Sequence, residues 1–219
     1  MIKYLMFSMI AATLVACNNE PKQTVQASEA ATVTDAADSN KTTTVYIVDT
    51  TLSNLAWEGY EGIALGKSEH NGVLKISSGS ISMQDNIPAS CKFTIAVNSL
   101  KVLDIPADKS GNAKLVKHLS SADFFDVAKF PEAIFEVTNA VANGTDSVNI
   151  TGNLTLKGVT KSITMPAAIK ITGDSLTATT PKFYINRKDW GMFYKSENSL
   201  GDEMIRNEMG IVINLVARK

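Results

Sequence analysis

The chain has 219 residues, a formal net charge of −1 at pH 7 and a hydrophobic content of 44%. A near-neutral chain without a cluster of basic residues lacks the electrostatic footprint of a nucleic-acid-binding protein, so we expect no DNA or RNA partner. The sequence holds two cysteines, and Cys91 lies in an apolar stretch where a thiol behaves as an inert core group. A chain of this length buries enough surface to fold without disulfides.

The first residues predict an export signal. An apolar run from Tyr4 to Val15 follows a single positive charge at Lys3. The run is shorter than the roughly 20 residues that a membrane-spanning helix needs, and it is typical of a cleaved signal peptide, here residues 1–16. Leu14-Val15-Ala16-Cys17 resembles the lipobox of bacterial lipoproteins. That resemblance implies cleavage before Cys17 and acylation of its thiol; an ordinary secretory signal with a chance cysteine is the alternative.

We therefore expect a lipoprotein of the cell envelope, periplasmic or in the outer membrane, that contacts the membrane through the acyl chains on Cys17. Two or more such chains anchor a protein stably, because each buried methylene contributes about 0.8 kcal/mol. Residues 17–43 contain no aromatic residue and are rich in Ala, Thr, Ser, Asp and Asn. Such a composition cannot bury enough apolar surface to become ordered, so this segment is predicted to be a flexible tether.

Residues 44–219 are predicted to form one domain of β-structure. Apolar, β-branched and aromatic residues recur there with a period of two and are separated by turn signals. The predicted strands cover residues 45–48, 53–58, 72–76, 80–83, 91–97, 133–137, 147–150, 152–157, 162–166, 182–186 and 209–216, with turns at 78–79 and 84–86. Several of these strands are expected to merge across a bend.

One short helix interrupts the strands. Between residues 112 and 130, Leu115, His118 and Leu119 recur at helical spacing, which predicts a helix that ends near Ser120. A run of antiparallel strands must protect its edges, and closing the sheet into a barrel removes the edges altogether. The fold class is therefore predicted to be all-β: a closed antiparallel barrel with one short inserted helix. A small barrel of about eight strands is either filled by side chains or holds one small ligand.

Several motifs resemble those of the YceI-like family of periplasmic proteins. The central one runs from His118 to Val127 and continues through Lys129-Phe130-Pro131 to Phe135; the others are His70-Asn71-Gly72, residues 152–161 and residues 185–191. The resemblance covers residues 44–219 and implies an eight-stranded antiparallel, lipocalin-like barrel with a helix beside or over it. Characterised members bind a long isoprenoid chain in an apolar tunnel, and no enzyme activity is generally established. Residues 104–111 depart from the charged sequences common in relatives.

An apolar tunnel needs large, uncharged inward-facing side chains, and the alternation assigns eleven residues to that role. They are Phe93, Ile95, Val97, Phe135, Val137, Leu154, Leu156, Ile163, Met165, Phe183 and Ile185. The same side chains would also fill a solid core, and a period of two does not distinguish the two cases. The family resemblance favours the tunnel.

Three polar residues are candidates for a lipid head group or for closing the barrel. Arg187 lies at a strand end and, if buried, needs a carboxylate such as Asp189 or Asp126. It would either receive the head group or pin one end of the barrel, and we favour the structural role. His118 is expected to be a capping or core hydrogen-bonding residue. The two histidines of the chain lack companions at metal-ligand spacing, so no metal site is predicted.

The sequence thus predicts a non-catalytic protein that holds an apolar isoprenoid-type lipid, a quinone or a polyprenyl species, inside the barrel. No other cofactor is expected. The alternative is an envelope stress-response or structural interaction protein whose barrel is filled by its own side chains. An enzyme acting on a lipid is disfavoured, because no acid–base pair stands out. Whether the barrel forms a homodimer is left open.

Overall fold

The computed structural model describes residues 24–33, 41–61, 69–196 and 204–219. Cys17 and the expected signal peptide lie outside these residues. The strands are β1 (Ser28–Glu29), β2 (Thr44–Val48), β3 (Asn54–Tyr60), β4 (Glu69–Gln84), β5 (Ile87–Val102), β6 (Glu132–Ala142), β7 (Ser147–Leu156), β8 (Val159–Thr172), β9 (Ser175–Thr179), β10 (Phe183–Asn186) and β11 (Glu208–Arg218). The helices are α1 (Ser110–Leu119) and the 3₁₀ helix η1 (Arg187–Trp190).

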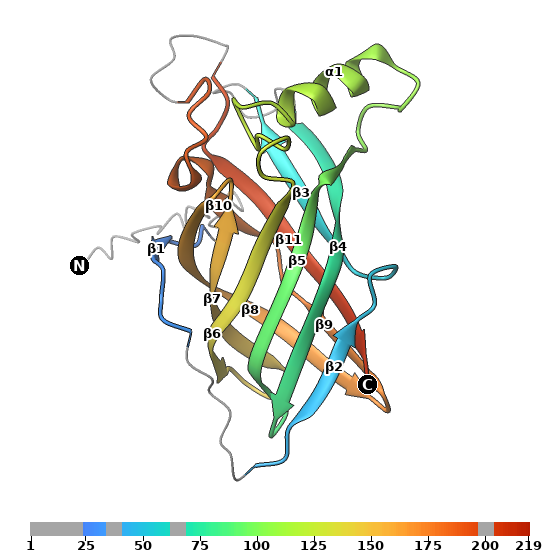
Figure 1. Ribbon diagram of the computed structural model, residues 1–219, viewed down its shortest axis with the longest axis vertical. Helices are drawn as coiled ribbons and strands as arrows, with labels where there is room; N and C mark the ends of the chain where they lie inside the picture. The colour runs from blue at the N-terminus through green and yellow to red at the C-terminus, as the bar shows by residue number, and fades with distance from the viewer. Residues whose placement is uncertain (1–23, 34–40, 62–68, 197–203) are drawn as a thin grey trace, which may run out of the picture.

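The strands close into an antiparallel barrel (Figure 1). Eight of them form the ring, in the order β3, β4, β5, β6, β7, β8, β9 and β11, and β11 pairs again with β3. Like β3, the strand β2 lies between β4 and β11, but further along the barrel. It pairs with residues 80–83 of β4 and 217–218 of β11, whereas β3 pairs with residues 69–75 and 210–214. The predicted all-β, eight-stranded, lipocalin-like fold is confirmed.

The helix α1 lies over one end of the barrel, which we call the helix end (Figure 1). It begins after a loop that the side chain of Asn112 holds in place, because its Nδ2 donates to the carbonyls of Val102 at 3.2 Å and Ile105 at 2.6 Å. It ends at Leu119, as the spacing predicted. No helix in the described part of the chain is long and apolar enough to cross a membrane.

Two features of the sheet differ from the prediction. Residues 78–79, expected as a turn, lie inside β4 next to an irregularity in its pairing with β5. Gly79 is needed there for space, since a Cβ on it would lie 2.6 Å from Cβ of Phe93. The strand β9, which the sequence did not reveal, joins β8 to β11 and so completes the ring.

Residues 24–33 lie against the barrel, which corrects the prediction of a tether over all of 17–43. β1 pairs antiparallel with β8, with Ser28 opposite Ser162, and Thr24 forms a parallel bridge with Tyr184 of β10. Val25 is buried, and its N–H donates to the carbonyl of Tyr184 at 2.8 Å. The polar composition suggested disorder, but the unpaired edges of β8 and β10 supply the backbone partners that order this segment.

Candidate functional site

The interior of the barrel holds a cavity of about 340 Å³ at the helix end. Strands β3, β4, β5, β6, β7, β10 and β11 supply its walls, and α1 with the residues that follow it supplies its roof. Most of the lining is aliphatic or aromatic; it includes Leu55, Trp57, Leu74, Ile95, Val97, Leu115, Leu119, Phe124, Phe125, Ala133, Leu154, Leu156, Ile185, Met209 and Ile211. The cavity reaches the surface, because exposed Glu61 also belongs to its wall.

All eleven residues predicted to face inward are buried. Five of them line the cavity: Ile95, Val97, Leu154, Leu156 and Ile185. The others fill the barrel below it, and four of these, Phe93, Phe135, Val137 and Met165, surround a second space of only about 40 Å³. Ile163 and Phe183 are buried without lining either space. The barrel is therefore hollow at the helix end and filled at the opposite end.

Two phenylalanine rings line the smaller space and lie two residues along β5 and β6 from Ile95 and Ala133, which line the cavity. Phe93 and Phe135 pack with their centroids 5.5 Å apart, tilted by 37°. Phe135 also lies close against Gly152, where a Cβ would meet its Cζ at 2.4 Å. We call this pair the floor of the cavity. Because there is no room for a side chain between position 152 and the ring of Phe135, the floor is held in place by close packing.

Trp57 forms part of the cavity wall, and Gly72 of the His70-Asn71-Gly72 motif packs against it. They are cross-strand partners on β4 and β3, and a Cβ on Gly72 would lie 2.7 Å from the indole ring. The glycine thus leaves room for the ring beside the cavity. Trp57 was not singled out as a site residue from the sequence, because its partnership with a glycine on another strand is not visible there.

The roof of the cavity is an aromatic cluster. The ring of His118 makes edge contacts with Phe124 at 5.1 Å and with Tyr194 at 4.8 Å between centroids. Its Nε2 lies 3.5 Å from a carboxylate oxygen of Asp123. His118 is therefore a packed roof residue, and the described residues contain no group of three side chains able to hold a metal ion.

Arg187 lies at the helix end of β10 and is 1% exposed. The expectation of a carboxylate partner is wrong, because Arg187 forms no ion pair with a carboxylate of the described residues, Asp189 and Asp126 included. Three backbone carbonyls accept from its guanidinium instead, those of Met192 at 2.6 Å, Ile205 at 3.0 Å and Arg206 at 3.0 Å. Desolvation by burial lowers the pKa of Arg187. These contacts favour the structural role, in which Arg187 ties two segments across the end of the barrel.

A second polar contact ties the 103–109 loop to the rim. His70 donates through Nδ1 to Asp104 Oδ2 at 2.8 Å, and the N–H of Asn71 donates to Oδ1 at 3.0 Å. Burial alone would raise the pKa of Asp104, but the hydrogen bonds from His70 and Asn71 hold it below its usual value. The histidine of the His70-Asn71-Gly72 motif thus holds the loop of Asp104 against the rim of the cavity. Asp104 lies 34 residues from His70 in the chain, and spacing gave no sign of the pairing.

The remaining titratable groups do not form a catalytic arrangement in the described part of the chain. Burial raises the pKa of the Cys91 thiol to about 12, so it carries no reactive thiolate at neutral pH. Burial, together with hydrogen bonds to Tyr184 and Glu58, raises the pKa of Tyr60. Glu58 also pairs with Lys182, which raises the pKa of that lysine. These pairs connect the outer faces of β3 and β10 near the rim.

An eight-stranded antiparallel barrel with an apolar cavity beneath one short helix defines a lipocalin-like barrel protein. Residues 46–217 match the YceI-like domain, and the chain belongs to the YceI-like family. It is 38% identical over 110 residues to the protein YceI of Salmonella arizonae and to that of Salmonella paratyphi B. These matches cover 50% of this chain and 54% of each relative, so the chain spans about half the length of the curated relatives it matches.

Two solved structures share the fold. BcnA of Burkholderia cenocepacia has a TM-score of 0.57 at 19% identity, over 78% of this chain and 99% of that one. A polyisoprenoid binding domain from Saccharophagus degradans has a TM-score of 0.59 at 17% identity, over 79% of this chain and 97% of that one. At such identities the likeness establishes the fold alone.

Proposed function

We propose that this protein binds one apolar, isoprenoid-type lipid in the cavity at the helix end of the barrel and performs no catalysis. The observation that carries the proposal is the apolar wall of that cavity, which residues of seven strands build around about 340 Å³. Cavities that bind small molecules typically measure about 300–1,000 Å³, so this space is large enough for a ligand. The likeness to a polyisoprenoid binding domain supports the choice of lipid.

The cavity favours an end-on mode of binding. Its volume is near the lower limit for ligand sites, and the floor of Phe93 and Phe135 closes it below. A long isoprenoid therefore inserts only part of its chain, and the remainder lies at the rim or outside. A quinone or a polyprenyl species with such a chain is the proposed ligand.

The proposal places the protein in the cell envelope as a lipoprotein anchored at Cys17. The supporting observation is the sequence Leu14-Val15-Ala16-Cys17 after a signal-length apolar run. A lipid carrier benefits from such an anchor, since its ligand is drawn from a bilayer. Changing Cys17 to Ser should move the protein out of the membrane fraction.

The test is to extract the purified full chain with organic solvent and to identify the released lipid by mass spectrometry. We expect close to one apolar lipid per chain. In the Ala133→Phe variant, the new ring fills the cavity from its wall, so bound lipid should fall by at least about tenfold while stability is kept. Val141→Phe adds a ring on the same strand at an exposed position and should retain the lipid.

A second candidate is a structural interaction protein without a ligand, and the filled opposite end of the barrel favours it. If extracts of the wild-type chain repeatedly contain no lipid, and added isoprenoids do not bind, this second function replaces the first.

A further inference from the structure

The barrel wall beside the cavity is not completed by the eight ring strands. β9 pairs with β8 only between residues 168 and 172, so the edge of β8 from 159 to 163 has no ring neighbour. β10 pairs with β11 on one edge only. The gap between these two edges, which we call the seam, is filled by residues 24–31 (Figure 1).

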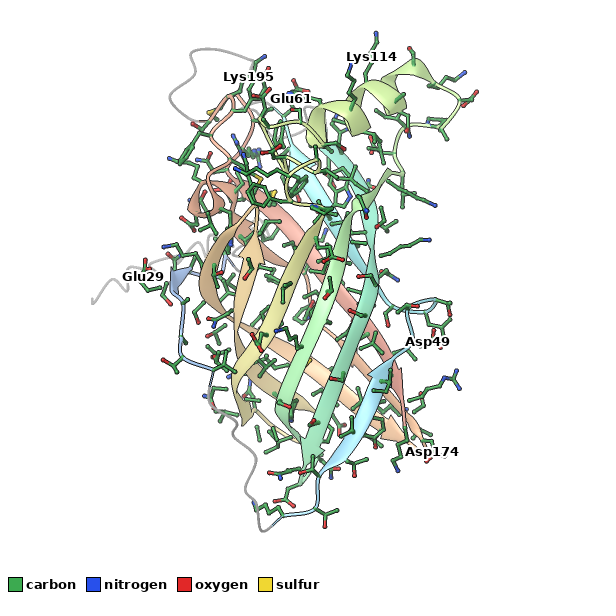
Figure 2. The ribbon with its side chains drawn as sticks, viewed as in Figure 1. Glu29, Asp49, Glu61, Lys114, Asp174 and Lys195 are labelled. Atoms are coloured by element: carbon green, nitrogen blue, oxygen red, sulfur yellow. The ribbon has the colours of Figure 1, made fainter. Side chains whose placement is uncertain are left out.

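These residues run along the seam as an extra strand. They are antiparallel to β8 and lie parallel to β10, which is the arrangement required of a strand inserted between the two. Beyond β1 the chain crosses to β7, where the side chain of Asn153 holds the backbone of Ala31 through two hydrogen bonds of 2.9 and 2.7 Å. Glu29 pairs with Lys161 at 2.6 Å on the outer surface (Figure 2).

The seam lies at the level of the cavity. Lys161, opposite Glu29, is itself paired with Leu154, which lines the cavity. On the other side, Tyr184, which bridges Thr24, is followed by the lining residue Ile185. Residues 24–31 therefore cover the barrel between two strands that bound the ligand space.

The segment is weakly attached compared with the ring strands. β1 has two residues, both exposed, whereas β8 has 14. Val25 and Ala27 are the apolar side chains by which it contacts the core. Segments with few buried apolar contacts and exposed backbone pairing open at low free-energy cost.

The proposed anchor is close to the seam in the sequence. Thr24 lies seven residues after Cys17, which span at most about 24 Å at roughly 3.4 Å per residue. A chain fixed to β10 at Thr24 and to the bilayer at Cys17 holds the seam near the membrane. In the ring of strands, β4 and β5 lie on the opposite side of the barrel from the seam.

We propose that the seam between β8 and β10 is the surface that faces the anchoring bilayer, and that displacement of residues 24–31 admits the lipid through it. This inference rests on the proposed function. Its partner is the lipid bilayer that carries the anchor. Residues 24–31 then have two roles: they connect the barrel to the anchor at Cys17, and they form the part of the cavity wall that can be displaced.

The first test locks the segment in place. Ser28 and Ser162 are cross-strand partners, so their Cα atoms lie within the range that a disulfide requires. The full-length acylated variant Ser28→Cys/Ser162→Cys, in vesicles of phosphatidylethanolamine and phosphatidylglycerol, is given a fluorescent isoprenol as the probe. Oxidation should slow uptake at least about tenfold, and reduction should restore it. The matched lock Ser82→Cys/Ser90→Cys joins β4 to β5 and should change uptake less than twofold.

Uptake at the same rate in the oxidised and reduced seam variant would overturn the proposed path. The amount of isoprenol bound after long incubation is measured in parallel. If no form of the protein binds it, the proposed function fails; if all forms bind it equally and only the rate is insensitive to the lock, the seam alone is refuted.

The second test measures orientation. A fluorophore is attached at Thr164→Cys on the outer side of β8 or at Lys92→Cys on β5; both positions are exposed, and native Cys91 is buried. With spin-labelled lipid head groups in the vesicle, we expect at least about threefold stronger quenching at position 164 than at 92. Equal quenching, or stronger quenching at 92, would contradict a membrane-facing seam.

Discussion

Arg187 shows how a buried charge is stabilised without a counterion among the described residues. Its guanidinium donates to three carbonyls on two separate segments, and a planar group with several donors is needed to reach all three. A lysine at this position carries all three of its N–H donors on one nitrogen, whereas the three carbonyls are contacted by three different nitrogens of the guanidinium. Arg187→Lys should therefore lower the free energy of unfolding by about 3 kcal/mol, because buried carbonyls lose charged donors.

Urea denaturation of the full chain measures this change. Arg218→Lys is the matched control, since that side chain is 63% exposed, and its effect should stay within about 0.5 kcal/mol. An Arg187→Lys variant as stable as the wild type, but depleted of lipid, would instead point to a head-group role.

Asp104 gives the rim a dependence on pH. Its folded-state pKa is depressed, so the stability that it contributes is present above the unfolded-state pKa of about 3.9 and is lost as pH falls through the folded value. Asp104→Asn removes this contribution. The wild type should be more stable than the variant at pH 6, and the difference should shrink steadily below about pH 4. Thermal unfolding from pH 3 to 6 checks it, and a gap that is constant across this range would contradict the assignment.

At the scale of elements, the N-terminal segment is the part most sensitive to a single apolar contact. Val25 is buried against the barrel, whereas Val33, eight residues further along, is 44% exposed. Val25→Asp should release residues 24–31, because burying a carboxylate there costs more than the segment gains from its pairing. Hydrogen exchange at the amides of Val25 and Ala31 should become at least about tenfold faster, while Val33→Asp leaves it unchanged. Unaltered protection in Val25→Asp would mean that the backbone pairing alone holds the segment.

The sequence predicts an element when the interactions that order it lie within that element, and fails when they come from distant segments of the chain. Inward-facing residues such as Ile95 and Leu154 follow from alternation within one strand, and α1 follows from Leu115, His118 and Leu119 within one helix. By contrast, β1 is a strand only because β8 and β10 leave their edges unpaired, which is a property of distant segments. The same holds for Arg187, whose acceptors come from residues 192, 205 and 206.

The alternation of apolar and polar residues also did not predict that one half of the barrel is hollow and the other half filled. Phe93 and Ile95 have the same polarity and the same position in the period, yet one belongs to the floor and the other to the cavity wall. What separates them is a neighbour on another strand: Gly79 lies against Phe93, and Gly152 against Phe135. Glycines on strands signal such close approaches, but the partner is known only once the strands are in register.

At the scale of the whole molecule, we expect the floor to limit how much of a ligand enters the barrel. Phe135 lines the space of about 40 Å³ but not the cavity of about 340 Å³, so removal of its ring should join the two. Phe135→Ala should destabilise the protein by about 3–5 kcal/mol and lengthen the isoprenoid chain that binds best. Ile163→Ala also removes a buried side chain but lines neither space, so it should lower stability without changing the preferred length.

Competition between isoprenols of increasing chain length measures this preference, at a temperature where both variants remain folded. The wild type should gain affinity with each added unit until the inserted chain meets the floor, and then level off. In Phe135→Ala the plateau should come at a longer chain, because the deeper space buries more methylenes and each contributes about 0.8 kcal/mol. A plateau at the same length in both proteins would mean that the chain does not reach Phe135, and that the ligand lies entirely among the residues of the rim and the roof.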